Sequence, residues 1–545
     1  MDKKKRYSIF QNIQYALANI WRWDKRYYLA FIPKIPLSIF FPLAMIYFPA
    51  LLINMIEQNV SDTTLLLHIG IYSAMLVTMG IIQLFCDARI TSTQYVFSFL
   101  YNGEVGYKTY TMDFAHTENP KIANMKEHSH SGGDSGENMP KDINRFLINL
   151  LGIFTFGTII GTLNLLILLL LIVSTCINYA VLAYVRNYTD KNRDKWVGYD
   201  RKGDYLYELS RQYEHAKDIK IYNMRPWLLA LTQQYQSLRM KWHKKTNNKE
   251  LLAGLVDAGL QFIRDGVAYA VLIGMFLNDY IDLGSFIFYF GAIAGFSNWL
   301  SSIIGQFNAI ATHSDNINRL REYLNVEDTF NHGEGIALPK EVPYEITFKN
   351  VSYTYPHSEK AILDNLNFTI EKGEKIAIVG VNGAGKTTLV KLMCGLYQPT
   401  SGQVLLAGND AKEYNIDDYY TQFSAVFQDI NLMPVPIVNY LAGSFEKVDR
   451  EKAYAALKLA GLDTRINKLP NGIDTTLVKG IFDDGIDLSG GEKQKLMLAR
   501  ALYKDAPVIV LDEPTAALDP IAENELYLKY AELTQGKTSV YISHR

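Results

Sequence analysis

Cysteine and net charge are both scarce in this chain, and the scarcity excludes several classes of protein. The 545 residues include three cysteines, Cys86, Cys176 and Cys394, whose wide spacing forms no disulfide framework, metal site or redox motif. We therefore expect buried thiols. The formal net charge is −2, far from the basic excess of a nucleic-acid-binding domain, so no nucleic-acid partner is expected. Residues 1–6 are basic, but no apolar core with a cleavage site follows, so we expect no cleavable signal peptide.

Charge is missing altogether from Phe146 to Val185, and this absence is the clearest membrane signal in the chain. These forty residues would reach about 60 Å as a single helix, about twice the hydrocarbon thickness of a bilayer. The stretch must therefore cross the membrane, turn near Gly161–Asn164 and cross back. Over the whole chain, hydrophobic residues make up 48% and charged residues 20%, which is apolar for a soluble protein.

Four other apolar runs complete a predicted bundle of six membrane-spanning helices. The first run contains four prolines, which are costly inside a soluble helix but are tolerated in membrane spans. An amphipathic helix over Tyr7–Trp23 suits the membrane interface, although a soluble amphipathic helix would show the same pattern. The four runs are Leu29–Ile56, Leu65–Phe85, Leu251–Leu277 and Leu283–Ile310.

The distribution of basic residues predicts the orientation of the bundle. The predicted outer loops, Glu57–Thr64 and Asn278–Asp282, contain no Lys or Arg, whereas Arg186–Lys249 contains fifteen. Lys and Arg favour the cytoplasmic side of a membrane. We therefore expect an integral protein of the cytoplasmic membrane, in contact with the lipid bilayer, whose N-terminus, long loops and C-terminal domain are cytoplasmic.

The two long inner segments keep helix-like spacing, so we expect the spanning helices to continue past the bilayer and turn back. The turns are predicted near Met112–Pro120 and near Tyr205–Gln212. Within the first segment, His128–Asn138 is polar and contains glycines, which predicts a flexible break. We divide the chain into a membrane domain (1–328), a linker (329–343) and a C-terminal domain (344–545).

A glycine-rich loop organises the C-terminal domain. Ile376–Val379 is a short apolar run that predicts a buried parallel strand, and residues 380–388 read GVNGAGKTT before a predicted helix. This spacing is that of a P-loop, whose backbone N–H groups surround phosphate oxygens at a helix N-terminus. Lys386 would reach the β- and γ-phosphates, and the Thr387 hydroxyl would bind Mg²⁺. The predicted phosphate-binding residues are Gly380, Asn382, Gly383, Ala384, Gly385, Lys386, Thr387 and Thr388.

Further motifs follow the P-loop in order, and with the six spans they resemble an ABC exporter half-transporter. LSGGEKQ at Leu488–Gln494 resembles the ABC signature, which is far more specific than the P-loop, and VIVLDE at Val508–Glu513 predicts a strand ending in two acids. The resemblance covers essentially the whole chain. It implies an all-α membrane domain of six spanning helices fused to an α/β P-loop NTPase domain. It also implies ATP and Mg²⁺ as cofactors, an exported substrate, and a dimer with a second copy or a homologous half-transporter.

The resemblance also implies a role for each matching residue. Tyr355 would stack on adenine, and Gln428 would bind Mg²⁺ and the attacking water. Asp512 would hold Mg²⁺ through water, and Glu513 would act as the general base. Ser489, Gly490 and Gly491 would bind the γ-phosphate held by the opposite subunit, Asp519 would contact the partner domain, and His544 would sense the γ-phosphate. The family normally continues for some tens of residues after this histidine, so we expect a C-terminally truncated domain.

The substrate is not predicted, but polar residues in two spans are candidates for contact with it. Arg264 and Asp265 lie about midway along the fifth span, where charge is costly. A polar face on the sixth span would line a central cavity or pack against another helix, and both alternatives stay open. The leading function is ATP-driven export, and the alternative is a membrane-bound ATPase that gates a partner. The polar face comprises Asn298, Ser301, Ser302, Gly305, Asn308 and Thr312.

Overall fold

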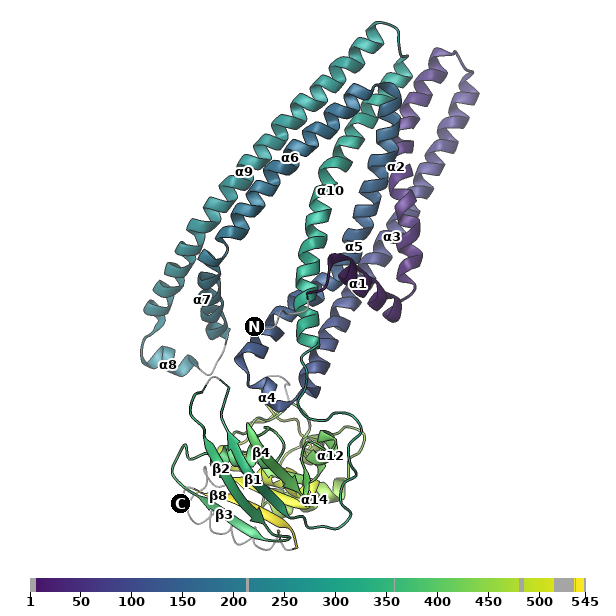
Figure 1. Cartoon of the computed structure of the whole chain (residues 1–545). Helices are drawn as coiled ribbons and strands as arrows, with labels where there is room; N and C mark the ends of the chain where they lie inside the picture. The colour runs from purple at the N-terminus through teal and green to yellow at the C-terminus, as the bar shows by residue number, and fades with distance from the viewer. Residues whose placement is uncertain are drawn as a thin grey trace. The chain divides into compact units, whose positions relative to one another are not determined.

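The chain forms two compact units. The computed structural model describes residues 6–211, 215–356, 358–479, 485–513, 534 and 536–543, except for the side chains of residues 190, 194, 301 and 304. One unit, called here the helical unit, comprises residues 1–106 and 126–324. The other, the sheet unit, comprises residues 107–125 and 325–545, so a short segment between two long helices belongs with the strands (Figure 1).

Six of the described helices are long and apolar enough to cross a membrane, which confirms the predicted number of spans. The first runs without interruption through Pro33, Pro36, Pro42 and Pro49. The predicted turn near Gly161–Asn164 is also confirmed, because one helix ends at Leu163 and the next begins at Leu165. The six helices are α2 (Tyr27–Glu57), α3 (Asp62–Thr111), α5 (Pro120–Leu163), α6 (Leu165–Asn192), α9 (Arg225–Leu277) and α10 (Leu283–Leu324).

Short helices complete the helical unit. Helix α1 (Ile9–Trp23) begins at a capping box, in which Ser8 and Gln11 exchange hydrogen bonds. Its buried residues Asn12, Ala16 and Ile20 lie on one face. Helices α7 (Asp194–Arg211) and α8 (Ala216–Ile221) lie between α6 and α9 in the sequence, and α6 and α9 run side by side (Figure 1).

The glycine-containing stretch His128–Asn138 is helical, so the predicted flexible break is wrong. Helix α5 passes straight through it. The glycines are there because neighbouring helices approach too closely for a side chain: a Cβ on Gly132 would lie 2.4 Å from the Leu320 Cβ, and one on Gly136 would lie 2.5 Å from the Tyr101 ring. Close helix packing, and not flexibility, therefore explains these residues.

Two further expectations need correction. The second loop was predicted to turn near Tyr205–Gln212, but residues 205–211 belong to helix α7, and Gln212 lies outside the described residues; α8 and α9, which begins at Arg225, follow. The other correction concerns the thiols. Cys86 and Cys394 are buried as expected, whereas Cys176 is exposed on α6, a helix whose apolar outer face suits lipid.

The described residues of the sheet unit form two four-stranded sheets. One is antiparallel, in the order β2-β1-β4-β5, and the other is parallel, in the order β3-β8-β7-β6. Strand β7 is buried on both faces, as expected of a parallel strand between two layers. The buried parallel strand was predicted at Ile376–Val379, in β3, which is parallel to β8 but not buried, because none of its residues is fully covered and Val379 is 68% exposed. The strands are β1 (Ile346–Tyr353), β2 (Leu363–Ile370), β3 (Lys375–Val379), β4 (Ser401–Leu406), β5 (Asn409–Asp410), β6 (Phe423–Val426), β7 (Val508–Asp512) and β8 (Thr538–Ser543).

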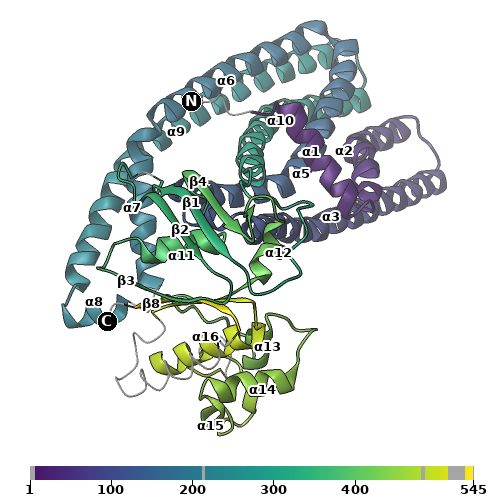
Figure 2. The same ribbon diagram turned by 60° about the horizontal axis from the view of Figure 1, so that its bottom comes forward.

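Two apolar cores hold this unit together, and β7 contributes to both. Val508 and Val510 pack in the core between the two sheets, whereas Ile509 and Leu511 pack in a second core with helices α13, α14 and α16. These three helices lie on the opposite side of β3 and β8 from β1, β2 and β4 (Figure 2). The parallel sheet is therefore fixed on both faces. The α-helices among the described residues of this unit are α4 (Phe114–Thr117), α11 (Lys386–Met393), α12 (Ile416–Thr421), α13 (Ile437–Ala442), α14 (Arg450–Leu459), α15 (Asp463–Ile466) and α16 (Gly490–Lys504).

Candidate active site

The glycine-rich loop joins β3 to α11, as its sequence predicts, and its shape depends on left-handed backbone. Gly383 has φ 80° and Gly385 has φ 87°, a region that residues with a side chain rarely adopt. A Cβ on Gly385 would also lie 2.8 Å from the Ile362 side chain. The loop borders a cavity of about 480 Å³, lined by Tyr355, Ile362, Asn382, Gly383, Gly385, Lys386, Thr387, Thr388, Gln428 and Glu513. The backbone therefore forms a cradle suited to phosphate groups.

Lys386 supplies the positive charge of this cavity. Its side chain is buried, and its Nζ donates hydrogen bonds to the carbonyl oxygens of Gly380, at 2.9 Å, and Val381, at 3.1 Å. A buried ammonium group in a concave site of backbone N–H groups attracts anions, because its charge is poorly screened there. The donors of this loop thus fit a polyphosphate.

The two acids at the end of β7 lie in different environments. Asp512 is fully buried, whereas Glu513 follows it and lines the cavity. Glu513 has φ 51°, a strained conformation for a residue with a side chain, and such strain concentrates at functional sites. Gln428, which follows β6, donates from its Nε2 to the Glu513 Oε2 at 3.1 Å. The parallel sheet therefore brings together two residues 85 positions apart, at the strand ends where such folds place their chemistry.

Tyr355 lies beside the P-loop helix within a cluster of tyrosine rings. Its hydroxyl is 2.8 Å from the Thr388 Oγ1, so the ring is tied to α11. Its ring lies nearly perpendicular to those of Tyr353 and Tyr397, which stack on each other with ring centroids 5.2 Å apart. The position of Tyr355 is consistent with the predicted contact to a base at the rim of the cavity.

The signature residues lie apart from this cavity. Ser489 is the N-cap of α16 and forms a capping box with Glu492. Hydrogen bonds from the Ser489 backbone, together with Arg465, hold the pKa of Glu492 below its ordinary value. Ser489, Gly490 and Gly491 are not among the residues that line the P-loop cavity. Asp519 and His544 lie outside the described residues.

Besides the residues around the P-loop, segment 107–125 of the sheet unit makes contacts with distant residues. The sequence gives no local signal for these contacts. Asp113 is buried, and its Oδ2 accepts hydrogen bonds from the backbone N–H groups of Thr329 and Phe330 and from the Thr329 hydroxyl. Its Oδ1 accepts from the His332 Nε2 at 2.8 Å. Burial alone would raise the pKa of Asp113, but these hydrogen bonds outweigh it and lower the pKa. The buried carboxylate thus fastens this segment to residues 329–332.

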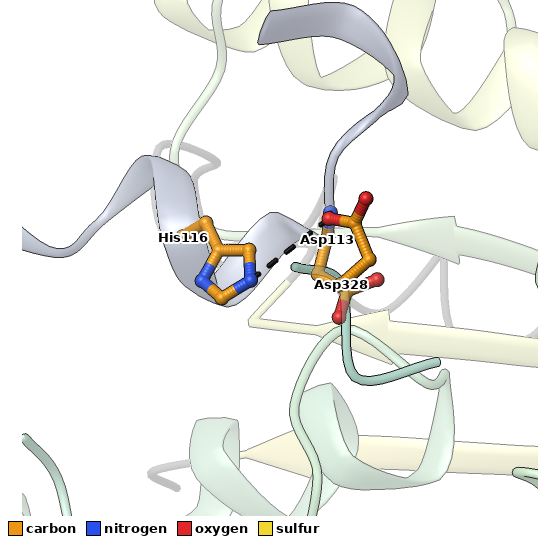
Figure 3. A group of neighbouring side chains, drawn as sticks. All are labelled: Asp113, His116 and Asp328. Carbon is orange, nitrogen blue, oxygen red and sulfur yellow. Dashed lines mark hydrogen bonds and ion pairs between the residues drawn. The ribbon is translucent and has the colours of Figure 1, made fainter. Parts of the chain in front are cut away.

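Asp113, His116 and Asp328 also form a group with metal-ligand chemistry, with their ligand atoms within 4.8 Å of one another (Figure 3). Other groups of the protein already contact these residues, however. The Lys108 ammonium lies 2.7 Å from the Asp328 Oδ2, and the His116 Nε2 lies 3.0 Å from the Glu327 carbonyl oxygen. A cation would have to displace a lysine ammonium, so this group is explained by hydrogen bonding and carries no metal assignment.

The charged residues of the fifth span pair with each other. The Arg264 Nε donates to the Asp265 Oδ1 at 2.9 Å, and Ser297 on α10 donates to the same oxygen at 3.1 Å. Arg264 is only 5% exposed, and its Nη2 has no hydrogen-bond partner among the described residues. About two turns before Asp265 in α9, Asp257 accepts a hydrogen bond of 2.6 Å from Asn178 on α6. Both acids therefore cross-link neighbouring helices.

The polar face of α10 is turned away from the rest of its own chain. Asn298, Ser302 and Thr312 are exposed, and Asn308 accepts a hydrogen bond from Arg186 at 2.7 Å. The side chain of Ser301 lies outside the described residues. Helix packing within the chain therefore does not explain the exposed members of this face.

Comparison with known proteins agrees with this architecture. Residues 363–516 match the family described as ABC transporter. The chain is 31% identical over 356 residues to the subtilin transport ATP-binding protein SpaT of Bacillus subtilis, covering 64% of this chain and 57% of that protein. It is 41% identical over 201 residues to an ATP-dependent lipid A-core flippase of Methylobacillus flagellatus, covering 37% of this chain and 34% of that one. Over 251 residues it is 39% identical to the mitochondrial iron-sulfur clusters transporter ATM1 of Saccharomyces cerevisiae, covering 46% and 35% of the two chains.

The likeness to a solved structure extends over both units. A bacterial Atm1-family ABC exporter with ATP bound has a TM-score of 0.80 and 20% identity, and covers 96% of this chain and 92% of its own. The chain spans 57% of the length of the subtilin transport protein and about a third of the other two curated relatives. The chain thus shares the fold of the solved exporter and matches the ABC transporter family over residues 363–516.

Proposed function

We propose that this chain, which carries an ABC transporter domain and has the fold of an ABC exporter, is one half of a dimeric pump that couples ATP hydrolysis to export. The observation that carries the proposal is the cavity in which Lys386 of the P-loop and the Gln428–Glu513 pair meet at the ends of parallel strands. Residues 1–328 act as the membrane domain, 329–343 as the linker and 344–545 as the ATPase domain.

The residues of the cavity, together with the buried Asp512 that precedes Glu513, divide the work of hydrolysis. Lys386 and the P-loop N–H groups hold the phosphates, and Thr387 and Asp512 are the residues that would hold Mg²⁺. A bound Mg²⁺ would neutralise charge that develops on the phosphate oxygens. Glu513 takes the proton of the attacking water, and Gln428 orients the same water through its hydrogen bond to Glu513.

Export needs a polar path through the apolar helices, and the exposed polar face of α10 supports one. Asn298, Ser302 and Thr312 face away from their own chain in a helix of membrane-spanning composition. Polar groups in such a helix normally face protein or a water-filled cavity, because lipid cannot satisfy them. In the dimer this face lines a cavity between the two membrane domains. The excess of basic residues in Arg186–Lys249 supports a cytoplasmic location for that segment and for the ATPase domain.

The dimer accounts for the signature residues, which do not line the cavity of their own chain. Ser489–Gly491 of a second copy, or of a homologous half, bind the γ-phosphate from the side that the P-loop leaves uncovered. In a homodimer, Lys386→Ala and Ser489→Arg each disable both sites. Co-expression produces mixed dimers with one intact site, which should trap ATP under conditions where neither variant traps it alone. A tagged mixed dimer that traps no nucleotide would exclude sharing between identical chains.

Reconstitution tests the transport function itself. The full chain in lipid vesicles should hydrolyse ATP with a Mg²⁺ requirement. A subset of a panel of lipids, peptides and amphiphilic drugs should stimulate this hydrolysis and accumulate on the opposite side of the membrane. Lys386→Ala should abolish both signals. Hydrolysis without stimulation or accumulation of any panel member would favour a membrane-bound ATPase that gates a partner.

A further inference from the structure

The segment 107–125, called here the loop tip, is fastened to the rest of the sheet unit at a second point besides Asp113. Glu118, at the end of α4, contacts Lys391 and Tyr397, which lie 273 and 279 residues further along the chain. Lys391 belongs to α11, the helix that begins at the P-loop, and Tyr397 follows the end of that helix. This contact therefore lies between the loop tip and the element that carries the nucleotide site.

Three side chains at this point form hydrogen bonds to one another in every pair. The Glu118 Oε1 accepts a hydrogen bond from the Lys391 Nζ at 2.9 Å, and its Oε2 accepts one from the Tyr397 hydroxyl. Lys391 also donates to the Tyr397 hydroxyl oxygen, at 3.1 Å. Burial, together with the Glu118 hydrogen bond, raises the pKa of Tyr397, so the hydroxyl stays a donor. Hydrogen bonds to charged groups are stronger than neutral ones, and here they fix the Tyr397 ring.

The ring of Tyr397 in turn contacts Tyr355. The Tyr355 ring meets it edge to face, with centroids 5.7 Å apart and planes at 87°. Tyr397 also stacks on Tyr353 with planes at 9°, and the Tyr353 ring lies at 81° to the Tyr355 ring, with centroids 5.1 Å apart. The opposite end of Tyr355, its hydroxyl, is held by Thr388. Tyr355 is therefore fixed by α11 at its hydroxyl and by two aromatic rings at its side.

We propose that Glu118 is a positioning residue for the nucleotide base, which holds Tyr355 in place beside the P-loop through Tyr397. The inference rests on the proposed function, because it takes Tyr355 to be the ring that stacks on adenine. Stacking is strongest when the ring plane is already set, since a free ring must lose rotational freedom on binding. The loop tip would then influence the affinity for the base without touching the nucleotide.

The test separates the base from the phosphates. Isothermal titration calorimetry of the full chain in nanodiscs would compare Mg²⁺ with the ATP analogue AMP-PNP, which carries a base, against Mg²⁺ with tripolyphosphate, which does not. Glu118→Ala should weaken AMP-PNP binding about fivefold, the lower end of what base–aromatic stacking contributes, and leave tripolyphosphate binding unchanged. Tyr397→Phe, which keeps the ring but removes the hydroxyl, should do the same. The double variant should be no weaker than either single one, because both remove one contact.

A matched control shows whether the effect belongs to this carboxylate. Glu446 is exposed in the same unit, so Glu446→Ala should change the binding of neither probe. Equal weakening of both probes in Glu118→Ala and Tyr397→Phe would overturn the inference, since the contact would then act on the P-loop helix as a whole. Unchanged AMP-PNP binding in both variants would overturn it too. Absence of AMP-PNP binding to the unsubstituted chain would overturn the proposed function, and the inference with it.

Discussion

The helical unit and the sheet unit place their polar and apolar residues in opposite ways. In the helical unit, Phe85 and Phe262 are 72% and 81% exposed, whereas Arg264 is 5% exposed. In the sheet unit, Val510 is fully buried, and the charged residues of its candidate site line an accessible cavity. The first arrangement suits a lipid solvent and the second suits water. The same substitution is therefore expected to have different consequences in the two units.

The largest effect is expected on ATP hydrolysis, for a substitution at the candidate active site of the sheet unit. Glu513→Gln should lower ATP hydrolysis by about 10²–10⁴-fold, because it removes the general base while keeping the size of the side chain. Nucleotide binding should persist, since Lys386 and the P-loop backbone are untouched. Steady-state hydrolysis and AMP-PNP affinity measured on the same preparation would check both parts. Turnover like that of the unsubstituted chain would remove Glu513 from the mechanism.

The two units also differ in how far their structure could be predicted from sequence. P-loop chemistry is local: the spacing of Gly380, Gly385 and Lys386 alone specifies a strand, a cradle and a helix, and the structure has all three. The six spans were predictable because apolar length is also a local property. The break at His128–Asn138 was wrong because a glycine has the same local signal in a turn as in close packing against Leu320 and Tyr101.

Long-range contacts escaped prediction for the same reason. Asp113 contacts residues more than 200 positions away, and Glu118 contacts Tyr397 across 279 positions. Neither acid belongs to a recognisable spacing, and a carboxylate near a helix start has many uses on a protein surface. Only the folded chain shows that these two carboxylates fasten the loop tip to the sheet unit.

The second largest effect is expected for a change in stability, when the buried ion pair of the helical unit is broken. Arg264→Gln leaves the Asp265 charge of α9 without its ion-pair partner, which should cost about 3–5 kcal/mol of stability. The double variant Arg264→Gln, Asp265→Asn should recover most of this loss, because no buried charge remains. The six tryptophans all lie in the helical unit, so the thermal midpoint of tryptophan fluorescence reports on it. A double variant as unstable as the single one would refute the charge argument.

A buried carboxylate in the sheet unit should show a smaller effect that depends on pH. Asp113→Asn should destabilise this unit by about 2–3 kcal/mol at neutral pH, because it removes a charged acceptor of several hydrogen bonds. The pKa of Asp113 is lower in the folded chain than its ordinary value of 3.8, so its contribution is complete above that value. As the pH falls through the folded pKa, the difference between the two proteins should vanish.

Tryptophan fluorescence cannot follow that change, since the sheet unit has no tryptophan. The buried Cys394 can, because its thiol reacts only when the unit opens. Urea midpoints of Cys394 labelling, with the other two cysteines replaced by serine, should separate the variants at pH 7. A difference that persisted unchanged at a pH well below 3.8 would show that the lost contact is not that of the ionised carboxylate.

The smallest effect is expected for an ion pair like that of Arg264 but placed on the surface of the sheet unit. Arg450 donates to both oxygens of Asp474, at 3.0 and 2.6 Å, and this hydrogen bonding lowers the pKa of Asp474. Its geometry is better than that of the Arg264–Asp265 pair, which shares one hydrogen bond of 2.9 Å. Geometry alone would therefore rank Arg450–Asp474 as the more stabilising pair.

Solvent reverses that ranking. Both side chains of the Arg450 pair are more than half exposed, so water solvates either charge when the other is removed, and salt screens their attraction. Arg450→Gln should consequently leave the urea midpoint of Cys394 labelling unchanged within error, and the double variant with Asp474→Asn should match it. Arg264→Gln provides the contrast, because its single and double variants should differ widely. A loss in Arg450→Gln as large as that in Arg264→Gln would mean that hydrogen-bond geometry, and not the surrounding solvent, determines the strength of ion pairs in this protein.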